Sequence, residues 1–187
     1  MLDNLLNAES SAEWLTNGNI LLHPTEGVWG IGCDAFNRKS FLRIYDLKKR
    51  SLNKSFILLV SSLEMILPYI ENLTKHEVSF LNDIWPGHTT ILFKYNADLP
   101  DHLKNETGKI AIRVSNHYPI NTLFNSFRGF LVSTSANISG TPTLLDLNQV
   151  AAEFINYNDV AVYNEGLGNA TKSSKIIDLE TRKIIRD

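Results

Sequence analysis

The sequence is poor in several features that would define a class of protein. Only one cysteine, Cys33, occurs in 187 residues, so no disulfide can form within the chain. The longest uninterrupted apolar run, residues 56–60, is far too short to cross a bilayer. The net charge is only −2, so no overall basic field attracts nucleic acid, and any basic groove must be local.

Metal-ligand patterns and targeting signals are also missing. The first residues, Met1–Asn4, lack the basic segment of a secretory signal and precede no long apolar core. We therefore expect a cytoplasmic protein with no membrane contact. The histidines have no metal-ligand spacing and no adjoining cysteine or acid cluster, so we expect no metal site among His23, His76, His88, His102 and His117.

The length of the chain, with 43% apolar residues, fits one large domain over residues 1–187. Apolar spacing predicts helices over 3–17, 39–49, 74–84, 120–127 and 147–154, with Asp3, Asn37 and Thr74 as N-caps and Gly18 ending the first helix. Short apolar runs predict strands over 20–22, 28–32, 56–60, 90–95, 110–114, 130–132, 160–163, 175–177 and 183–185. Helices and strands are interspersed without strict alternation, which predicts an α/β fold with a twisted, mixed, open sheet flanked by helices.

The most informative segment covers residues 131–140, where an apolar strand runs into hydroxyls, one amide and a glycine in the sequence LVSTSANISG. Hydroxyls and free backbone N–H groups at a strand end can surround a phosphate or carboxylate without burying another charge. Ser135 and Asn137 could instead cap a turn. The further hydroxyls of Ser133, Thr134 and Ser139 exceed what a cap can use, so we interpret the segment as an anion site.

A group of cations, Lys48, Lys49, Arg50 and Lys54, lies at the end of the second predicted helix. These cations could be a solvated helix end, because positive charge complements the C-terminal end of the helix dipole. Arg50 and Lys54 also directly precede a predicted core strand, in the kind of loop where α/β sheets hold ligands. Taken with the hydroxyl segment, the cations suggest a site for a polyanion, as nucleotide chemistry requires.

Arg113 interrupts the otherwise apolar strand IAIRV over residues 110–114. Its guanidinium must either leave the core or meet an anion there. A structural ion pair and a substrate carboxylate are the two alternatives.

Residues 30–35, GIGCDA, match the glycine fingerprint of dinucleotide-binding proteins. That fingerprint needs a strand, a tight glycine turn and then a helix, whereas residues 28–32 themselves have the pattern of a strand. We therefore reject the fingerprint. Glycines within a strand usually let a ligand or another backbone approach closely.

Five segments in order carry a resemblance to a known family: PTEGVWGIGCDA at 24–35, KKR at 48–50, WPG at 85–87, IAIRV at 110–114 and STSANISG at 133–140. Over residues 19–186 the chain resembles the YrdC-type threonylcarbamoyl-AMP synthases in their short, single-domain bacterial form. The resemblance implies a YrdC-like fold, similar to the DHBP-synthase-like fold, and a nucleotidyltransferase activity. Gly27 stands where the long-form enzymes carry a threonine, so a substrate contact there would have to come from the backbone.

The resemblance also implies roles for individual residues. The family's K-x-R and S-x-N motifs fall on the catalytic candidates Lys48, Arg50, Ser135 and Asn137. The implied ATP contacts are Arg50, Lys54, Ser135, Thr143 and Arg186. The implied L-threonine contacts are Thr25, Arg113, Ser133 and Ser174, with the substrate carboxylate in a planar pair with Arg113. No protein metal ligand is implied, and Mg²⁺ would be carried on the nucleotide.

The implied reaction joins L-threonine, bicarbonate or CO2, and ATP into L-threonylcarbamoyladenylate and pyrophosphate. The product would pass to downstream tRNA threonylcarbamoyl-transfer proteins for the t6A modification of adenosine 37 in tRNA. The alternative is a non-catalytic RNA-binding module of the same fold that uses the same cations on phosphate backbones, whereas the enzyme would bind RNA only weakly.

Overall fold

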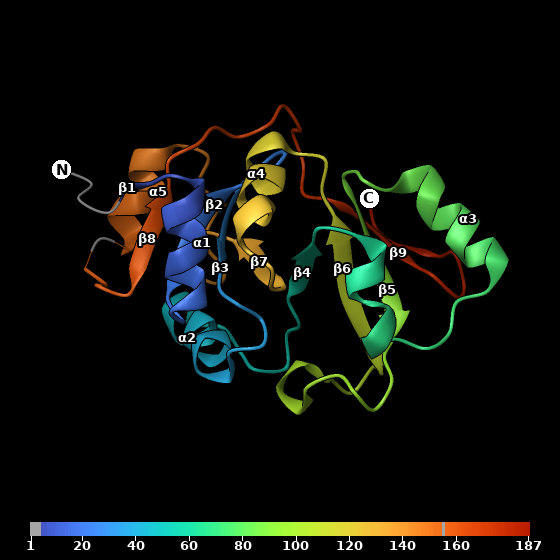
Figure 1. Cartoon of the computed structure of the whole chain (residues 1–187). Coiled ribbons are helices and arrows are strands. Elements are labelled where there is room, and N and C mark those ends of the chain that lie inside the picture. The colour runs from blue at the N-terminus through green and yellow to red at the C-terminus, as the bar shows by residue number, and fades with distance from the viewer. Residues whose placement is uncertain (1–4, 155) are drawn as a thin grey trace.

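The structure is a computed structural model that describes residues 5–154 and 156–187, and ten strands among them form one sheet (Figure 1). The order of the strands across the sheet is β1-β8-β2-β3-β7-β4-β6-β5-β9-β10. Their bounds are β1 Leu5–Leu6, β2 Ile20–Pro24, β3 Trp29–Gly32, β4 Ile57–Val60, β5 Thr89–Lys94, β6 Lys109–Val114, β7 Leu131–Ser135, β8 Val160–Tyr163, β9 Lys175–Asp178 and β10 Ile184–Arg186.

The pairing within this sheet is mixed. Strands run parallel at β1/β8, β2/β8, β4/β6 and β5/β9. They run antiparallel at β2/β3, β3/β7, β4/β7, β5/β6 and β9/β10. Because β1 and β10 are opposite edges, the predicted open, mixed sheet of an α/β fold is confirmed.

Helices cover both faces of the sheet. The described α-helices are α1 Ala8–Thr16, α2 Arg38–Lys48, α3 Lys75–Ile84, α4 Tyr118–Ser126 and α5 Leu147–Phe154. Alternating side chains of each strand meet different helices. In β4, Leu59 belongs to the apolar cluster of α1 and α4, which lie side by side in Figure 1, whereas Leu58 belongs to the cluster that α2 and α5 cover.

The first helix begins later than predicted. Leu5 and Leu6 pair in parallel with β8, and α1 starts behind Asn7, whose Oδ1 accepts a hydrogen bond of 2.9 Å from the Ser10 N–H. The predicted cap Asp3 lies outside the described residues. Sheet pairing therefore overrides the helical spacing of these leucines, while Gly18, at φ 80°, follows the helix end as predicted.

The other predicted N-caps are confirmed. Asn37 Oδ1 accepts a hydrogen bond from the Ser40 N–H at 3.2 Å at the start of α2. Thr74 and Glu77 form both hydrogen bonds of a capping box at the start of α3. Each of these caps depends only on residues three positions apart.

The glycines of β3 do allow close approaches, as predicted, and the neighbours are protein groups. A Cβ at Gly32 would lie 1.9 Å from the Val132 carbonyl oxygen of β7. A Cβ at Gly30 would lie 2.5 Å from Cε1 of the buried His23 ring. The paired strands can therefore lie close together only because these positions have no side chain.

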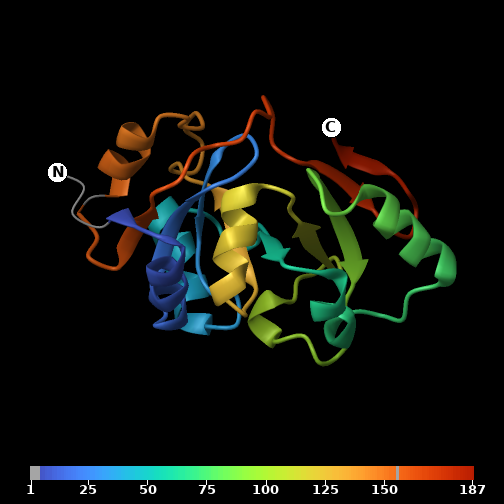
Figure 2. The ribbon, with the colours of Figure 1, turned by 45° about the horizontal axis from the view of Figure 1, so that its top comes forward.

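A crossing segment, residues 164–174, joins β8 to β9 and runs over the top of the molecule in Figures 1 and 2. It is held to the turn between β2 and β3 by two hydrogen bonds, from Gly168 N–H to Thr25 O at 2.9 Å and from Ala170 N–H to Glu26 O at 2.8 Å. A Cβ at Gly27 would lie 2.7 Å from the Ala170 carbonyl oxygen. Glycine at this position thus lets the crossing segment pack on the turn.

Candidate active site

A pocket of about 380 Å³ lies where β3, β4, β6 and β7 meet the C-terminal strands. It is lined by residues from segments far apart in the chain. Most of the residues predicted to contact substrate are among them, namely Thr25, Arg50, Arg113, Ser133, Ser135, Ser174 and Arg186. The fold therefore brings together candidates that the sequence places in separate motifs.

The end of β7 forms one wall of this pocket. The Ser133 hydroxyl bonds no other group in the described parts of the chain, so it is available to a ligand. Ser135 Oγ donates to Asn137 Oδ1 at 2.6 Å, and Asn137 Nδ2 donates to the Ile138 and Thr141 carbonyls at 3.0 and 2.6 Å. Asn137 therefore stabilises the turn through its side chain, as the capping alternative expected. The hydroxyls of Ser133, Thr134 and Ser135 line the pocket at the same time.

Lys48 lies beneath that wall instead of in the pocket. Its side chain is buried, and its ammonium donates to the Ser135 carbonyl and, at 2.7 Å, to the Asn137 carbonyl. Burial, with a smaller effect from the Arg50 charge, lowers the pKa of Lys48 to about 8. This geometry gives no support to the predicted direct contact of Lys48 with a triphosphate, and it makes Lys48 a support for the Ser135 backbone.

Arg50 enters the pocket because the chain reverses at the end of α2. Lys49 adopts the left-handed conformation at φ 49° and is exposed. Arg50 Nη2 donates to the Ser55 carbonyl at 3.0 Å, and the guanidinium lies 5.1 Å from the centre of the Phe56 ring. Its Nε is buried without a partner, and burial lowers the pKa of Arg50. Arg50 is thus a fixed cation with a free donor.

Arg113 lines the same pocket from β6, and the ion-pair alternative is present. Its Nη2 lies 3.2 Å from Oε2 of Glu26, and both side chains are buried. Ser115 Oγ donates to the other oxygen of Glu26 at 2.7 Å. Arg113 Nε is nevertheless buried without a hydrogen-bond partner, so the ion pair does not use every donor of the guanidinium.

The predicted contacts Arg186, Ser174 and Thr25 already have protein partners. Arg186 Nε and Nη2 donate to the Ser174 carbonyl at 3.0 and 2.7 Å, and Ser174 Oγ lies 2.8 Å from Thr90 Oγ1. Thr25 Oγ1 donates to the Val28 carbonyl at 2.7 Å. These groups shape the pocket through contacts that exist without a ligand.

Four predicted residues do not line the pocket: Lys48 and Asn137, which brace the end of β7, and two residues of exposed loops. Lys54 lies in the exposed loop before β4, where its carbonyl accepts a hydrogen bond of 3.0 Å from the Tyr45 hydroxyl. Thr143 is exposed in the loop before α5. Neither of these two side chains lines the pocket.

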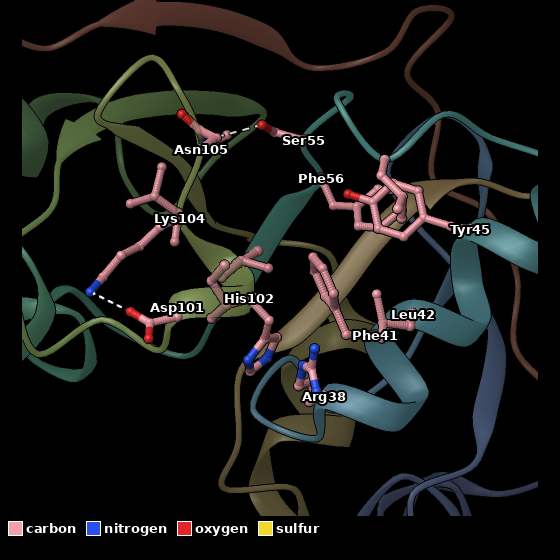
Figure 3. A pocket seen from close by; sticks show the side chains of 15 residues that line it. Arg38, Phe41, Leu42, Tyr45, Ser55, Phe56, Asp101, His102, Lys104 and Asn105 are labelled. Atoms are coloured by element: carbon pink, nitrogen blue, oxygen red, sulfur yellow. Dashed lines mark hydrogen bonds and ion pairs between the residues drawn. The ribbon is translucent and has the colours of Figure 1, made fainter.

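A second, larger pocket of about 550 Å³ lies between α2 and residues 101–105 (Figure 3). Its walls combine aromatic and aliphatic side chains, and Figure 3 shows Phe41 and Tyr45 of α2 on one side with His102 on the other. Apart from the exposed Arg38, its charged and amide side chains are paired. The pairs are Lys104 with Asp101 at 2.8 Å, Asn105 with the Ser55 hydroxyl at 3.1 Å and His102 with the Ala35 carbonyl at 2.8 Å.

Comparison with known proteins identifies the family. The family profile Sua5_yciO_yrdC, described as "Telomere recombination", matches residues 13–187. Two proteins named Threonylcarbamoyl-AMP synthase are similar over nearly their full lengths. The one from Aliivibrio fischeri is 33% identical, covering 96% of this chain and 98% of its own, and the one from Acinetobacter baumannii is 37% identical, covering 94% and 95%. The chain belongs to the Sua5/YciO/YrdC family.

A solved structure of this family confirms the fold. The structure of P. abyssi Sua5 complexed with L-threonine superimposes with a TM-score of 0.83 at 23% identity. The similarity covers 91% of this chain and 50% of that one. The resemblance predicted from the five sequence motifs, to the short form of the family and to its fold, is therefore confirmed.

Two residues at the site of this family member were not among the predicted contacts. His88 lines the pocket, and burial lowers its pKa, with Arg113 adding to the effect. Glu26 carries the carboxylate that pairs with Arg113. His88 follows directly after the WPG segment and Glu26 lies within PTE, so their place in family motifs was the signal that could have found them.

Neither a metal cluster nor a membrane span is found in the described parts of this family member. No group of three or more His, Cys, Asp or Glu side chains in residues 5–154 and 156–187 could hold a metal ion. No helix in the same ranges is long and apolar enough to cross a membrane.

Proposed function

We propose that the pocket is the active site of a threonylcarbamoyl-AMP synthase, a nucleotidyltransferase that serves the t6A modification of tRNA. The relatives at 33% and 37% identity bear that name over nearly their full lengths. The observation that carries the proposal is the convergence of three guanidinium groups, Arg50, Arg113 and Arg186, on one pocket. The reaction has two anionic substrates, a triphosphate and an amino-acid carboxylate, and such a pocket can hold both.

The L-threonine end of the pocket is the part around Arg113. Its unpaired Nε suits a carboxylate oxygen, and the free hydroxyl of Ser133 is a predicted neutral donor that lines the same pocket. Thr25 and Ser174 would form the sides of this subsite. The P. abyssi relative was solved with L-threonine, which supports this assignment at the level of the family.

The ATP end is the part around Arg50 and Arg186. Arg50 would neutralise charge on the triphosphate and on the leaving pyrophosphate, with Mg²⁺ carried on the nucleotide. Lys54 and Thr143 belong to exposed loops, so their contacts would form only when the nucleotide is bound. Ser135 would contact the nucleotide directly, while Lys48 and Asn137 hold its backbone and hydroxyl in place.

The chemistry needs no side-chain nucleophile. The neutral amine of L-threonine attacks the carbon of CO2, loses a proton and becomes a carbamate. A carbamate oxygen then attacks the α-phosphorus of ATP, and the bond from that phosphorus to the bridging oxygen breaks, which releases pyrophosphate. Catalysis consists of positioning and of stabilising the charge that develops on the leaving group.

The test is pyrophosphate release by the purified protein with ATP, bicarbonate and L-threonine together. We expect release that requires all three, and a product of the mass of threonylcarbamoyl-AMP. Release that ignores L-threonine would contradict the proposal. The downstream transfer proteins, weak RNA binding and the cytoplasmic location stay predictions.

A further inference from the structure

Glu26 is a buried acid that does not line the substrate pocket but pairs with Arg113, which does, and the reaction above assigns it no role. It follows Thr25 in the turn between β2 and β3 and is 7% exposed. Buried carboxylates are rare unless they are paired. Its partners therefore indicate what it does.

Glu26 is fixed at both its backbone and its side chain. Its carbonyl accepts a hydrogen bond of 2.8 Å from the Ala170 N–H of the crossing segment. Its Oε1 accepts a hydrogen bond of 2.7 Å from Ser115 Oγ. Its Oε2 lies 3.2 Å from Arg113 Nη2 in an ion pair that lacks hydrogen-bond geometry. A carboxylate fixed by its other contacts places a negative charge beside the guanidinium and so restrains where that guanidinium lies.

The pair leaves Arg113 only partly used. A guanidinium has five N–H donors, and Glu26 contacts one of its amino groups, while Nε remains buried without a partner. An ion pair serving stability alone would be expected to satisfy such a buried donor. The unpaired donor of a pocket-lining arginine points instead to a second acceptor that arrives with the substrate.

We infer that Glu26 is the positioning residue of the carboxylate subsite. It compensates the buried charge of Arg113 and orients the guanidinium so that its remaining donors meet the carboxylate of L-threonine. Ser115 acts one step further away, because it fixes the carboxylate of Glu26. This inference rests on the proposed function, in which Arg113 binds that carboxylate.

The test variant is Glu26→Gln, which keeps the size of the side chain and removes its charge. We expect the KM for L-threonine to rise about 10-fold and the KM for ATP to change less than about 2-fold. A second measurement uses L-threoninamide, which lacks the carboxylate. A merely structural role of Glu26 would leave the preference of the enzyme for L-threonine over this amide unchanged. The preference for L-threonine over the amide, as a ratio of kcat/KM values, should fall by a similar factor.

A double-mutant cycle shows whether Glu26 acts through Arg113. Arg113→Gln alone should impair L-threonine use, and adding Glu26→Gln should cause no further loss, because the positioned group is gone. The double variant also removes both buried charges, which favours folding over either single change. Additive losses of the two variants would overturn the inference.

A milder variant keeps the inference testable if Glu26→Gln fails to fold. Ser115→Ala leaves both charges in place and removes the hydroxyl that fixes Glu26, so the KM for L-threonine should rise about 3-fold. Glu153→Gln, on the exposed face of α5, is the matched control and should change neither KM. An unchanged KM for L-threonine and an unchanged preference over the amide would overturn the inference, in Glu26→Gln where it folds and in Ser115→Ala where it does not.

Failure of the proposed function would look different. In that case wild-type protein would release no pyrophosphate in response to L-threonine, or Arg113→Gln would use L-threonine normally. If wild type is active and only Arg113→Gln is impaired, the positioning role of Glu26 is wrong and the function stands.

Discussion

The candidate active site and the pocket between α2 and residues 101–105 differ in how their polar side chains are used. The larger pocket, between α2 and residues 101–105, has rim groups that pair with one another, as Lys104 does with Asp101. The smaller one has buried donors without protein partners, Nε of Arg50 and Nε of Arg113. Unpaired buried donors are costly unless a ligand satisfies them. Donor satisfaction, and not volume, therefore separates the candidate active site from its larger neighbour.

The comparison is informative because the pockets share a wall. Ser55, Phe56 and Ala111 line both, whereas Ile57 lines only the smaller pocket and Leu58 only the larger one. Since side chains alternate along β4, the pockets occupy opposite faces of the sheet. A change in one pocket can reach the other only through this wall and the loop before it.

The largest expected effect comes from removing an arginine that lines each pocket. Arg50→Ala should lower kcat/KM for ATP about 100-fold or more, because a partly buried charge that stabilises the leaving pyrophosphate is lost. Arg38→Ala is the matched control, since Arg38 is an exposed cation of the larger pocket. The rate of steady-state pyrophosphate release gives kcat/KM for ATP in both variants. Equal losses in the two variants would remove the distinction between the pockets.

The next prediction concerns the cation beneath the active pocket. The pKa of Lys48 is lowered by burial to about 8, below its ordinary value of 10.5. Between these values the unfolded chain binds more protons than the folded protein, so stability rises with pH. From about pH 7.5 to about pH 9.5, Lys48 should add about 2 kcal/mol to the free energy of unfolding.

Denaturant titrations of wild type and Lys48→Met across this pH range measure that contribution. The variant should lose the rise, whereas Lys49→Met, altered at the adjacent exposed position, should keep it. An identical pH dependence in wild type and Lys48→Met would place the Lys48 ammonium in solvent.

A smaller effect distinguishes the two ends of the active pocket. Arg113→Lys should raise the KM for L-threonine about 10-fold and the KM for ATP by less, because a point charge cannot replace a planar fork. Initial rates with each substrate varied in turn provide the values. Equal changes in both KM values would give Arg113 a structural role only.

Much of this comparison follows from local sequence patterns. The caps at Asn37 and at Thr74 with Glu77 are confirmed because each involves residues three positions apart. The predicted start of the first helix was wrong because the partners of Leu5 and Leu6 lie far along the chain in β8. Local spacing cannot report such long-range pairing.

The same limit applies to the site. Charge and the K-x-R motif suggested that Lys48 faces a ligand, but its partners are carbonyls of the Ser135–Asn137 turn, a distant segment. Glu26 has no local sign of its pairing with Arg113 on β6. The sequence could therefore name the residues of the pocket more readily than their roles, because roles depend on contacts between segments.

The smallest expected effect tests the shared wall. Asn105 Nδ2 donates to Ser55 Oγ at 3.1 Å, and Arg50 Nη2 donates to the carbonyl of the same Ser55. Asn105→Ala should therefore loosen Ser55 and raise the KM for ATP about 2-fold to 3-fold, while the KM for L-threonine stays unchanged.

Asp101→Ala, at the rim of the larger pocket but outside this chain of contacts, is the control. If both variants behave like wild type, the larger pocket is independent of the active site. If Asn105→Ala alone raises the KM for ATP, the larger pocket helps to position Arg50 through Ser55. The reason is that Asn105, in the larger pocket, holds Ser55 by a hydrogen bond from the opposite face of the sheet.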